Sequence, residues 1–115
     1  LDLNLLAALD VLERDDLISR AADLAPYFEA QIHNLRGLKH IVDIRNLGLA
    51  GAFQIEALPG EPGRRPWQIA LAAWERGLYV RFGGDTVQLG PPFIAEKADI
   101  DHICEVLAEV IPATP

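Results

Sequence analysis

The pattern of apolar residues changes at His40, and this change constrains the fold more than any other feature of the chain. Before it, apolar residues recur at helical spacing, which predicts a helix over residues 2–14 and another from Leu17 to about Leu35. After it, short β-prone runs alternate with helical segments. We expect strands over residues 41–45, 52–56, 78–82 and 86–89, and helices over residues 67–76 and 97–111.

The order α-α-β-β-α-β-β-α lacks a continuous βαβ repeat. It therefore favours an α+β fold with a small, mostly antiparallel sheet packed with helices. A chain of 115 residues, half of them hydrophobic, suffices for a single domain spanning residues 1–115 with its own core.

Some local details are predicted as well. Asp15 or Asp16 can cap the second helix, and Pro26 should bend or break it near Leu24. Residues 58–66, rich in Pro and Gly, are expected to form an exposed loop. Trp67 and Trp74 are seven residues apart on one helix, a spacing more typical of core residues than of a stacking platform.

Charge and composition limit the class of partner. A net charge of −7 disfavours nucleic acids and anionic membranes, which need clustered Lys and Arg. No apolar run approaches the roughly 20 residues needed to cross a bilayer. A single cysteine cannot form an internal disulfide, which favours a reducing, cytoplasmic location. The chain has no methionine and begins within an apolar pattern, so we expect it to be a fragment of a longer polypeptide.

Arg81 is the main candidate for a binding residue. It alternates with Val80 and Phe82 in a predicted strand, so its side chain should point away from theirs. The planar guanidinium is suited to gripping a carboxylate through two parallel hydrogen bonds. The alternative is an ion pair with Asp85 or Glu96. Glycines beside the arginine allow a ligand to approach the backbone and favour the binding role.

Gly83, Gly84 and Asp85 follow Arg81 directly. They lack the longer glycine spacing and the Lys-Ser/Thr of a nucleotide-binding loop, so a hairpin turn is the better interpretation. Their expected role is to shape the loop beside Arg81.

Other chemistry-bearing residues give weaker signals. The three histidines share no metal-ligand spacing with one another or with Cys104, so no metal is expected and exposed or helix-face positions are favoured for them. Cys104 falls in register with apolar residues of the last helix and is interpreted as a small core residue. Lys39 and Lys97 lie in a loop and a first helical turn, which do not suit the desolvated amine of a Schiff base. No catalytic residue is predicted within this chain.

Segments throughout the chain, in the same order, resemble the C-terminal small domain of the class III pyridoxal-phosphate aminotransferases, and within them the ω-amino acid (β-alanine):pyruvate transaminases. The resemblance runs through residues 9–14, 25–29, 35–38, 42–49, 59–60 and 100–101. Its most specific motifs are Gly77-Leu78-Tyr79-Val80-Arg81, Gly84-Asp85-Thr86 and Gly90-Pro91-Pro92-Phe93.

The resemblance implies a parent enzyme that transfers an amino group from an amino acid or amine to a keto acid such as pyruvate. It implies pyridoxal 5'-phosphate as the cofactor, held as a lysine Schiff base, and a homodimer. Arg81 matches the family's arginine for the substrate carboxylate. The cofactor-binding residues of the family belong to a large domain upstream of Leu1, so the fragment alone is expected to bind no cofactor and to be inactive.

Two alternatives stay open at this stage. One is a non-catalytic domain that binds an anionic small molecule through Arg81. The other is an interaction domain whose leucine-rich first helix packs on a partner. Exposed apolar surface on the first helices would point instead to a missing large domain or dimer mate.

Overall fold

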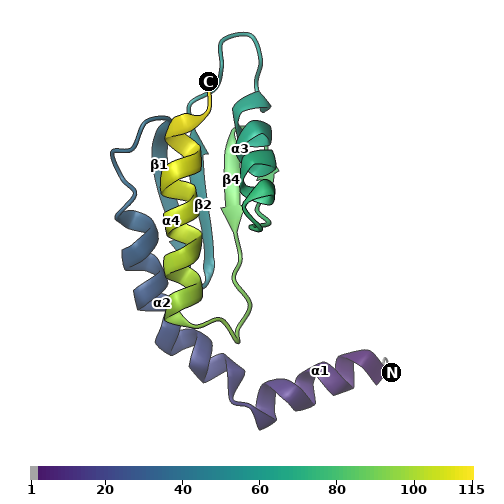
Figure 1. Ribbon diagram of the computed structural model, residues 1–115. Helices are drawn as coiled ribbons and strands as arrows, with labels where there is room; N and C mark the ends of the chain where they lie inside the picture. The colour runs from purple at the N-terminus through teal and green to yellow at the C-terminus, as the bar shows by residue number, and fades with distance from the viewer. Residues whose placement is uncertain (1–2) are drawn as a thin grey trace.

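The computed structural model describes residues 3–115 and confirms both the α+β class and the predicted order of elements (Figure 1). The expected start of the first helix at Asp2 lies outside the described residues. The elements are α1 (Leu3–Arg14), α2 (Leu17–His33), β1 (Ile41–Leu47), β2 (Ala50–Ile55), α3 (Arg64–Glu75), β3 (Arg81–Gly83), β4 (Thr86–Leu89) and α4 (Lys97–Ala113).

The four strands form one sheet in the order β1-β2-β4-β3, and every neighbouring pair is antiparallel. Residues that face one another across the strands share a face of the sheet. The register therefore aligns two rows that lie on opposite faces. One row is Ile44, Phe53, Val87 and Phe82, and the other is Arg45, Ala52, Gln88 and Arg81.

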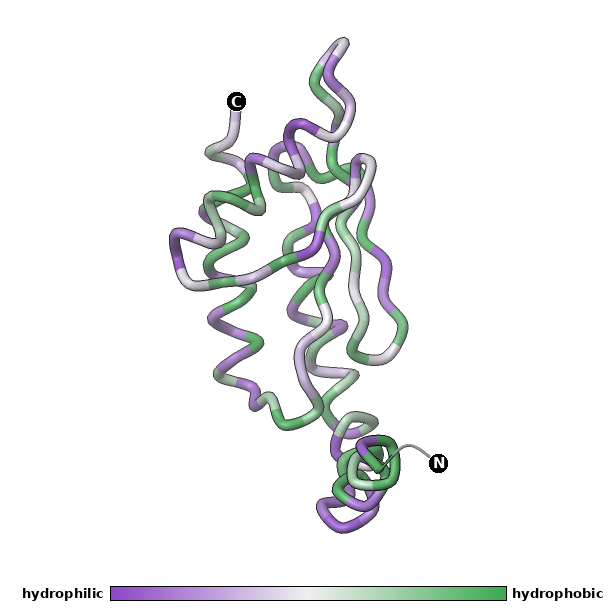
Figure 2. The backbone as a smooth tube through the Cα atoms, turned by 90° about the vertical axis from the view of Figure 1, so that its right-hand side faces the viewer, coloured by the Kyte–Doolittle hydropathy of each residue, from purple (hydrophilic) through white to green (hydrophobic). Residues whose placement is uncertain are grey.

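Helices α2, α3 and α4 all lie on the same side of the sheet (Figure 1). The view turned by 90° shows the resulting two layers, with the sheet on one side and helices on the other (Figure 2). The core lies between them, and Phe53 and Val87 of the first row are fully buried there together with Phe28 of α2. Gly51 of β2 allows this close packing, because a Cβ at that position would lie 3.1 Å from the Phe28 ring. Within residues 3–115, no helix covers the opposite face.

Helix α2 continues through Pro26, so of the two expected outcomes, a bend or a break near Leu24, the break does not occur. Proline removes one intrahelical hydrogen bond, but Leu24, Phe28 and Ile32 are buried on both sides of it, and this packing outweighs the loss. Asp16 occupies the position before the helix, as expected, with a left-handed backbone, but its side chain makes no capping hydrogen bond.

Helix α3 begins at Arg64, earlier than expected, so the predicted exposed loop is partly helix. Pro66 falls in the first turn, where a missing N–H costs no helical hydrogen bond. Arg65 and Pro66 are buried. The Arg65 guanidinium donates to the carbonyl oxygens of Glu56 and Pro115, so backbone groups satisfy this buried charge.

Trp67 and Trp74 do not belong to the core, contrary to the prediction. Helix α3 buries Ile69 and Ala73 against the sheet, and both tryptophans lie on its outer face, where Trp74 is 65% exposed. The Trp74 ring instead packs edge-on against Tyr79, with 6.1 Å between ring centroids.

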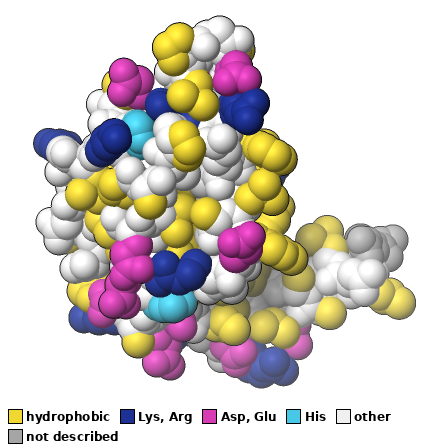
Figure 3. Space-filling model, turned by 45° about the horizontal axis from the view of Figure 1, so that its top comes forward, with side chains coloured by type: hydrophobic (Ala, Val, Ile, Leu, Met, Phe, Trp, Pro, Cys, Tyr) yellow, Lys and Arg dark blue, Asp and Glu magenta, His cyan; other side chains and the backbone are white. Residues whose placement is uncertain are grey.

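Helix α1 projects away from the two layers (Figure 1). It contributes no buried residue, and its leucines Leu3, Leu5, Leu6 and Leu9 are exposed. Hydrophobic side chains are visible along this projecting segment in the space-filling view (Figure 3). Such an apolar surface is typical of a helix that packs on another domain or chain.

Candidate functional site

Strands β3 and β4 form the predicted hairpin. Gly83 pairs with Thr86 at its end, which leaves Gly84 and Asp85 as the two turn residues. Gly84 has a φ of 54°, a left-handed conformation that glycine adopts without strain. The Thr86 hydroxyl donates to the Gly83 carbonyl oxygen at 2.8 Å and closes the turn. The hairpin fixes the position of Arg81 two residues before the turn.

Asp85 ties this turn to the rest of the domain. Its Oδ1 accepts a hydrogen bond from the Gly63 N–H at 3.0 Å, and its backbone carbonyl accepts one from Ile55 N–H at 2.7 Å. The first bond leads to the start of α3 and the second to the end of β2. Asp85 therefore holds the Arg81 hairpin in place from two sides.

Arg81 lies on the uncovered face of the sheet. It is opposite Gln88 of β4, in the row that continues through Ala52 to Arg45. Its neighbour Phe82 belongs to the other row, which faces the helices, as the alternation predicted. Arg81 is exposed. Its side chain is therefore directed to solvent on a sheet face that carries both polar and small residues.

The alternative of an ion pair is not what the structure contains. Asp85 is engaged with Gly63, and Glu96 forms a capping box with Asp99 at the start of α4. Within residues 3–115, the Arg81 side chain has no hydrogen bond or ion pair. An arginine without an internal partner is available to bind an anion.

We expect Asp85→Ala to lower the free energy of unfolding by about 1–3 kcal/mol, because it leaves the partly buried Gly63 N–H without its charged acceptor. Urea unfolding of the 115-residue chain measures this change. The matched control is Asp43→Ala, which removes an exposed carboxylate paired with Arg45 at 3.3 Å on the same sheet. The control should change stability by no more than about 0.5 kcal/mol. Equal losses in the two variants would contradict the anchoring role of Asp85.

Two of the three histidines, His33 and His40, have structural partners. His33 Nε2 lies 2.9 Å from Asn46 Oδ1. His40 is buried and its Nε2 lies 2.9 Å from the Thr114 carbonyl oxygen, so the expected exposed or helix-face position was wrong for this residue. Its contact joins segments 74 residues apart, which sequence spacing does not reveal. Among the described residues, no group of three or more His, Cys, Asp or Glu side chains could hold a metal ion.

Cys104 is buried in α4, as predicted for a small core residue. Burial, with a smaller contribution from Asp101, raises the pKa of its thiol to about 11. The thiol is therefore protonated at neutral pH and does not act as a nucleophile.

Neither lysine fits the site of a pyridoxal phosphate group. Lys39 and Lys97 are both exposed, and the Lys97 ammonium lies 5.1 Å from the centroid of the Tyr27 ring. A Schiff-base lysine needs a desolvated amine that can lose its proton, and neither environment provides this. Neither lysine of this chain therefore provides the Schiff-base amine of that cofactor.

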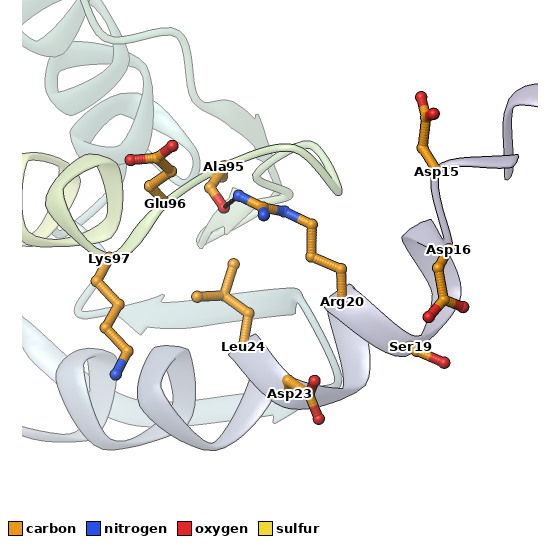
Figure 4. Close-up of a pocket in the computed structure, with 9 residues that line it drawn as sticks. All are labelled: Asp15, Asp16, Ser19, Arg20, Asp23, Leu24, Ala95, Glu96 and Lys97. Carbon is orange, nitrogen blue, oxygen red and sulfur yellow. Dashed lines mark hydrogen bonds between the residues drawn. The ribbon is translucent and has the colours of Figure 1, made fainter.

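A hollow between α2 and the segment before α4 contains a second arginine (Figure 4). Arg20 crosses this hollow and donates to the carbonyl oxygens of Phe93, Ile94 and Ala95 at 3.1, 3.1 and 3.2 Å. Acidic side chains also line the hollow, among them Asp23 and Glu96, together with neutral residues and Lys97. Since the guanidinium is already engaged, the hollow is a structural junction. Sequence reasoning missed Arg20, because its partners are backbone groups more than 70 residues away.

No helix within residues 3–115 has the length and apolar character needed to span a membrane.

An α+β domain of this fold also occurs within solved aminotransferase structures. A solved structure described as a transaminase with L-ala superposes with a TM-score of 0.86 over 92% of this chain and 26% of that protein, at 23% identity. The acetylornithine aminotransferase of Elizabethkingia anophelis gives a TM-score of 0.80 over 92% of this chain and 26% of its own, at 28% identity.

The family comparison is more specific. The model of the family described as Aminotransferase class-III matches residues 3–111. This chain therefore belongs to the class III aminotransferases, a family that depends on pyridoxal phosphate.

The curated relatives indicate which members of this family the chain resembles. The β-alanine–pyruvate aminotransferase of Pseudomonas aeruginosa is 48% identical over 106 residues, and the ω-amino acid–pyruvate aminotransferase of Pseudomonas putida is 44% identical over the same length. Each alignment covers 92% of this chain and 24% of the relative. The chain thus spans about a quarter of the length of the curated relatives it matches.

Proposed function

We propose that this chain is the C-terminal, carboxylate-binding part of an aminotransferase that moves an amino group from an amino acid or amine to a keto acid such as pyruvate. The names of the two Pseudomonas relatives described above support pyruvate as the amino acceptor. The coverage of only 24% of those relatives supports a larger parent protein.

The observation that carries this proposal is the unpaired guanidinium of Arg81 on the open face of the sheet. A guanidinium can donate two parallel hydrogen bonds to one carboxylate, and such charge-assisted pairs are about twice as strong as neutral ones. The rigid hairpin holds the arginine in place, and Asp85 anchors the hairpin. Gly83 and Gly84 bring no side chain that would obstruct a ligand beside it.

The remainder of the parent protein is the expected partner of this chain. The exposed leucines of α1 supply an apolar surface for a large domain or a second subunit, and a homodimer is the assembly that the family resemblance implies. A large domain would also bring the cofactor lysine, because Lys39 and Lys97 do not fit that role. The isolated chain should therefore show no aminotransferase activity.

The intact mass and absorbance of the natural protein containing this segment test the proposal. We expect a mass several times that of the 12.6 kDa chain, a yellow, lysine-bound cofactor, and transfer of the amino group of β-alanine to pyruvate. A colourless protein of the mass of this chain, unchanged by added pyridoxal phosphate, would contradict the enzymatic proposal. That result would support a non-catalytic domain that binds an anionic small molecule.

A further inference from the structure

Gln88 stands directly opposite Arg81 in the antiparallel pair of β3 and β4. Side chains at such positions share a face of the sheet, with Cβ atoms about 4.5–5.5 Å apart. Both residues are exposed. No hydrogen bond engages the Gln88 side chain within residues 3–115, so its amide is as available as the guanidinium beside it.

The rest of the row leaves room for a ligand. Ala52, the next residue across the sheet, has a small side chain and is only partly exposed. Arg45 at the far end is paired with Asp43 at 3.3 Å, so its charge is partly compensated. Arg81 and Gln88 are therefore the two neighbouring groups of this row that can donate hydrogen bonds to a bound anion.

We propose that Gln88 is a substrate-binding residue that donates a hydrogen bond from its Nε2 amide to the same carboxylate that Arg81 binds. This inference rests on the proposed function and extends it from one residue to a pair. The guanidinium supplies charge and two donors, and the amide supplies a third donor on the adjacent strand. A planar carboxylate has enough acceptor positions for all three.

Three variants of the full-length enzyme test this inference. Gln88→Leu removes the donor while retaining a similar size, and Gln88→Glu places a carboxylate beside Arg81 that competes with the substrate. Gln54→Leu is the matched control, because Gln54 lies on the same sheet face, opposite Thr86, on a strand separated from β3 by β4. KM and kcat are compared for pyruvate as acceptor and for an amine donor that has no carboxylate.

We expect Gln88→Leu to raise KM for pyruvate roughly tenfold, the effect of losing one hydrogen bond to a charged group. Gln88→Glu should raise it further, and neither variant should change KM for the amine. The dissociation constant of propionate, measured by calorimetry, should rise in parallel. Gln54→Leu should leave all these values near those of the unmodified enzyme.

Parallel measurements on Arg81→Ala separate this inference from the proposed function. Arg81→Ala could impair the reaction with the keto acid more than the reaction with the amine, while Gln88→Leu leaves KM as unchanged as Gln54→Leu does. In that case the role of Gln88 is overturned and the role of Arg81 stands. If Gln88→Leu weakens both substrates equally, Gln88 has a structural role only. If Arg81→Ala shows no discrimination, both assignments fail.

Discussion

Replacing Arg81 with alanine in the full-length enzyme is expected to lower kcat/KM for keto acids roughly 30- to 900-fold. This range corresponds to about 2–4 kcal/mol, the contribution of a charge-assisted, bidentate contact. The effect on amines that lack a carboxylate should be far smaller, because their binding makes no use of the guanidinium. Steady-state kinetics with pyruvate and with such an amine, measured on the same preparation, provide the comparison.

Two further variants test whether the effect depends on the guanidinium of Arg81. Arg81→Lys keeps the charge but loses the planar fork, so it should recover only part of the loss. Arg45→Ala removes the arginine at the opposite end of the same row, where Asp43 already pairs with it. Arg45→Ala should change kcat/KM for the two substrates to the same extent. If Arg81→Ala lowers kcat/KM equally for both substrates, Arg81 is not part of the substrate-binding site.

The order of elements could be predicted because it depends on local patterns. Apolar residues at helical spacing give α1, α2 and α4, and β-prone runs separated by glycine-rich turns give both strand pairs. The turn at Gly84 and Asp85 was predictable for the same reason, since its conformation depends on adjacent residues. The position of Arg81 between alternating apolar residues likewise indicated which face of the strand it occupies.

The features that sequence reasoning missed depend on contacts between distant segments. Arg65 is buried because Glu56 and Pro115 supply carbonyl oxygens to it, and neither partner can be recognised from spacing. The tryptophans of α3 face outward because Ile69 and Ala73 meet the sheet. Helical periodicity locates a helix better than it decides which of two apolar stripes will be buried.

The candidate site also contains one residue that local sequence indicates and one whose position depends on contacts between distant segments. Arg81 could be proposed from its residue type, its flanking glycines and the family resemblance. Gln88 could not be proposed from the sequence, because its position opposite Arg81 requires the register of β3 on β4. The sheet order also places β4 between β2 and β3, which sets Ala52 and Arg45 in the same row. Strand order is a long-range property that local patterns do not determine.

Phe53→Ala should have the largest effect on stability of the changes considered, about 3–5 kcal/mol of the free energy of unfolding. Phe53 is fully buried in β2, between Ile44 and Val87 in the row that faces the helices. Its removal leaves a cavity and withdraws support from β4, the strand on which the Arg81 hairpin is built. Urea unfolding of the 115-residue chain measures the loss.

The matched control is Phe82→Ala, at the end of the same row, where the ring is 47% exposed. A half-exposed ring loses less transfer free energy and leaves no closed cavity, so its loss should be about 1 kcal/mol. Hydrogen exchange of the full-length protein should show faster exchange in β2 and β4 for Phe53→Ala, because both strands share the weakened core. Similar losses for the two variants would mean that the sheet is not held by its buried row. The hairpin would then depend mainly on the Asp85 anchor, and Asp85→Ala would become the more damaging change.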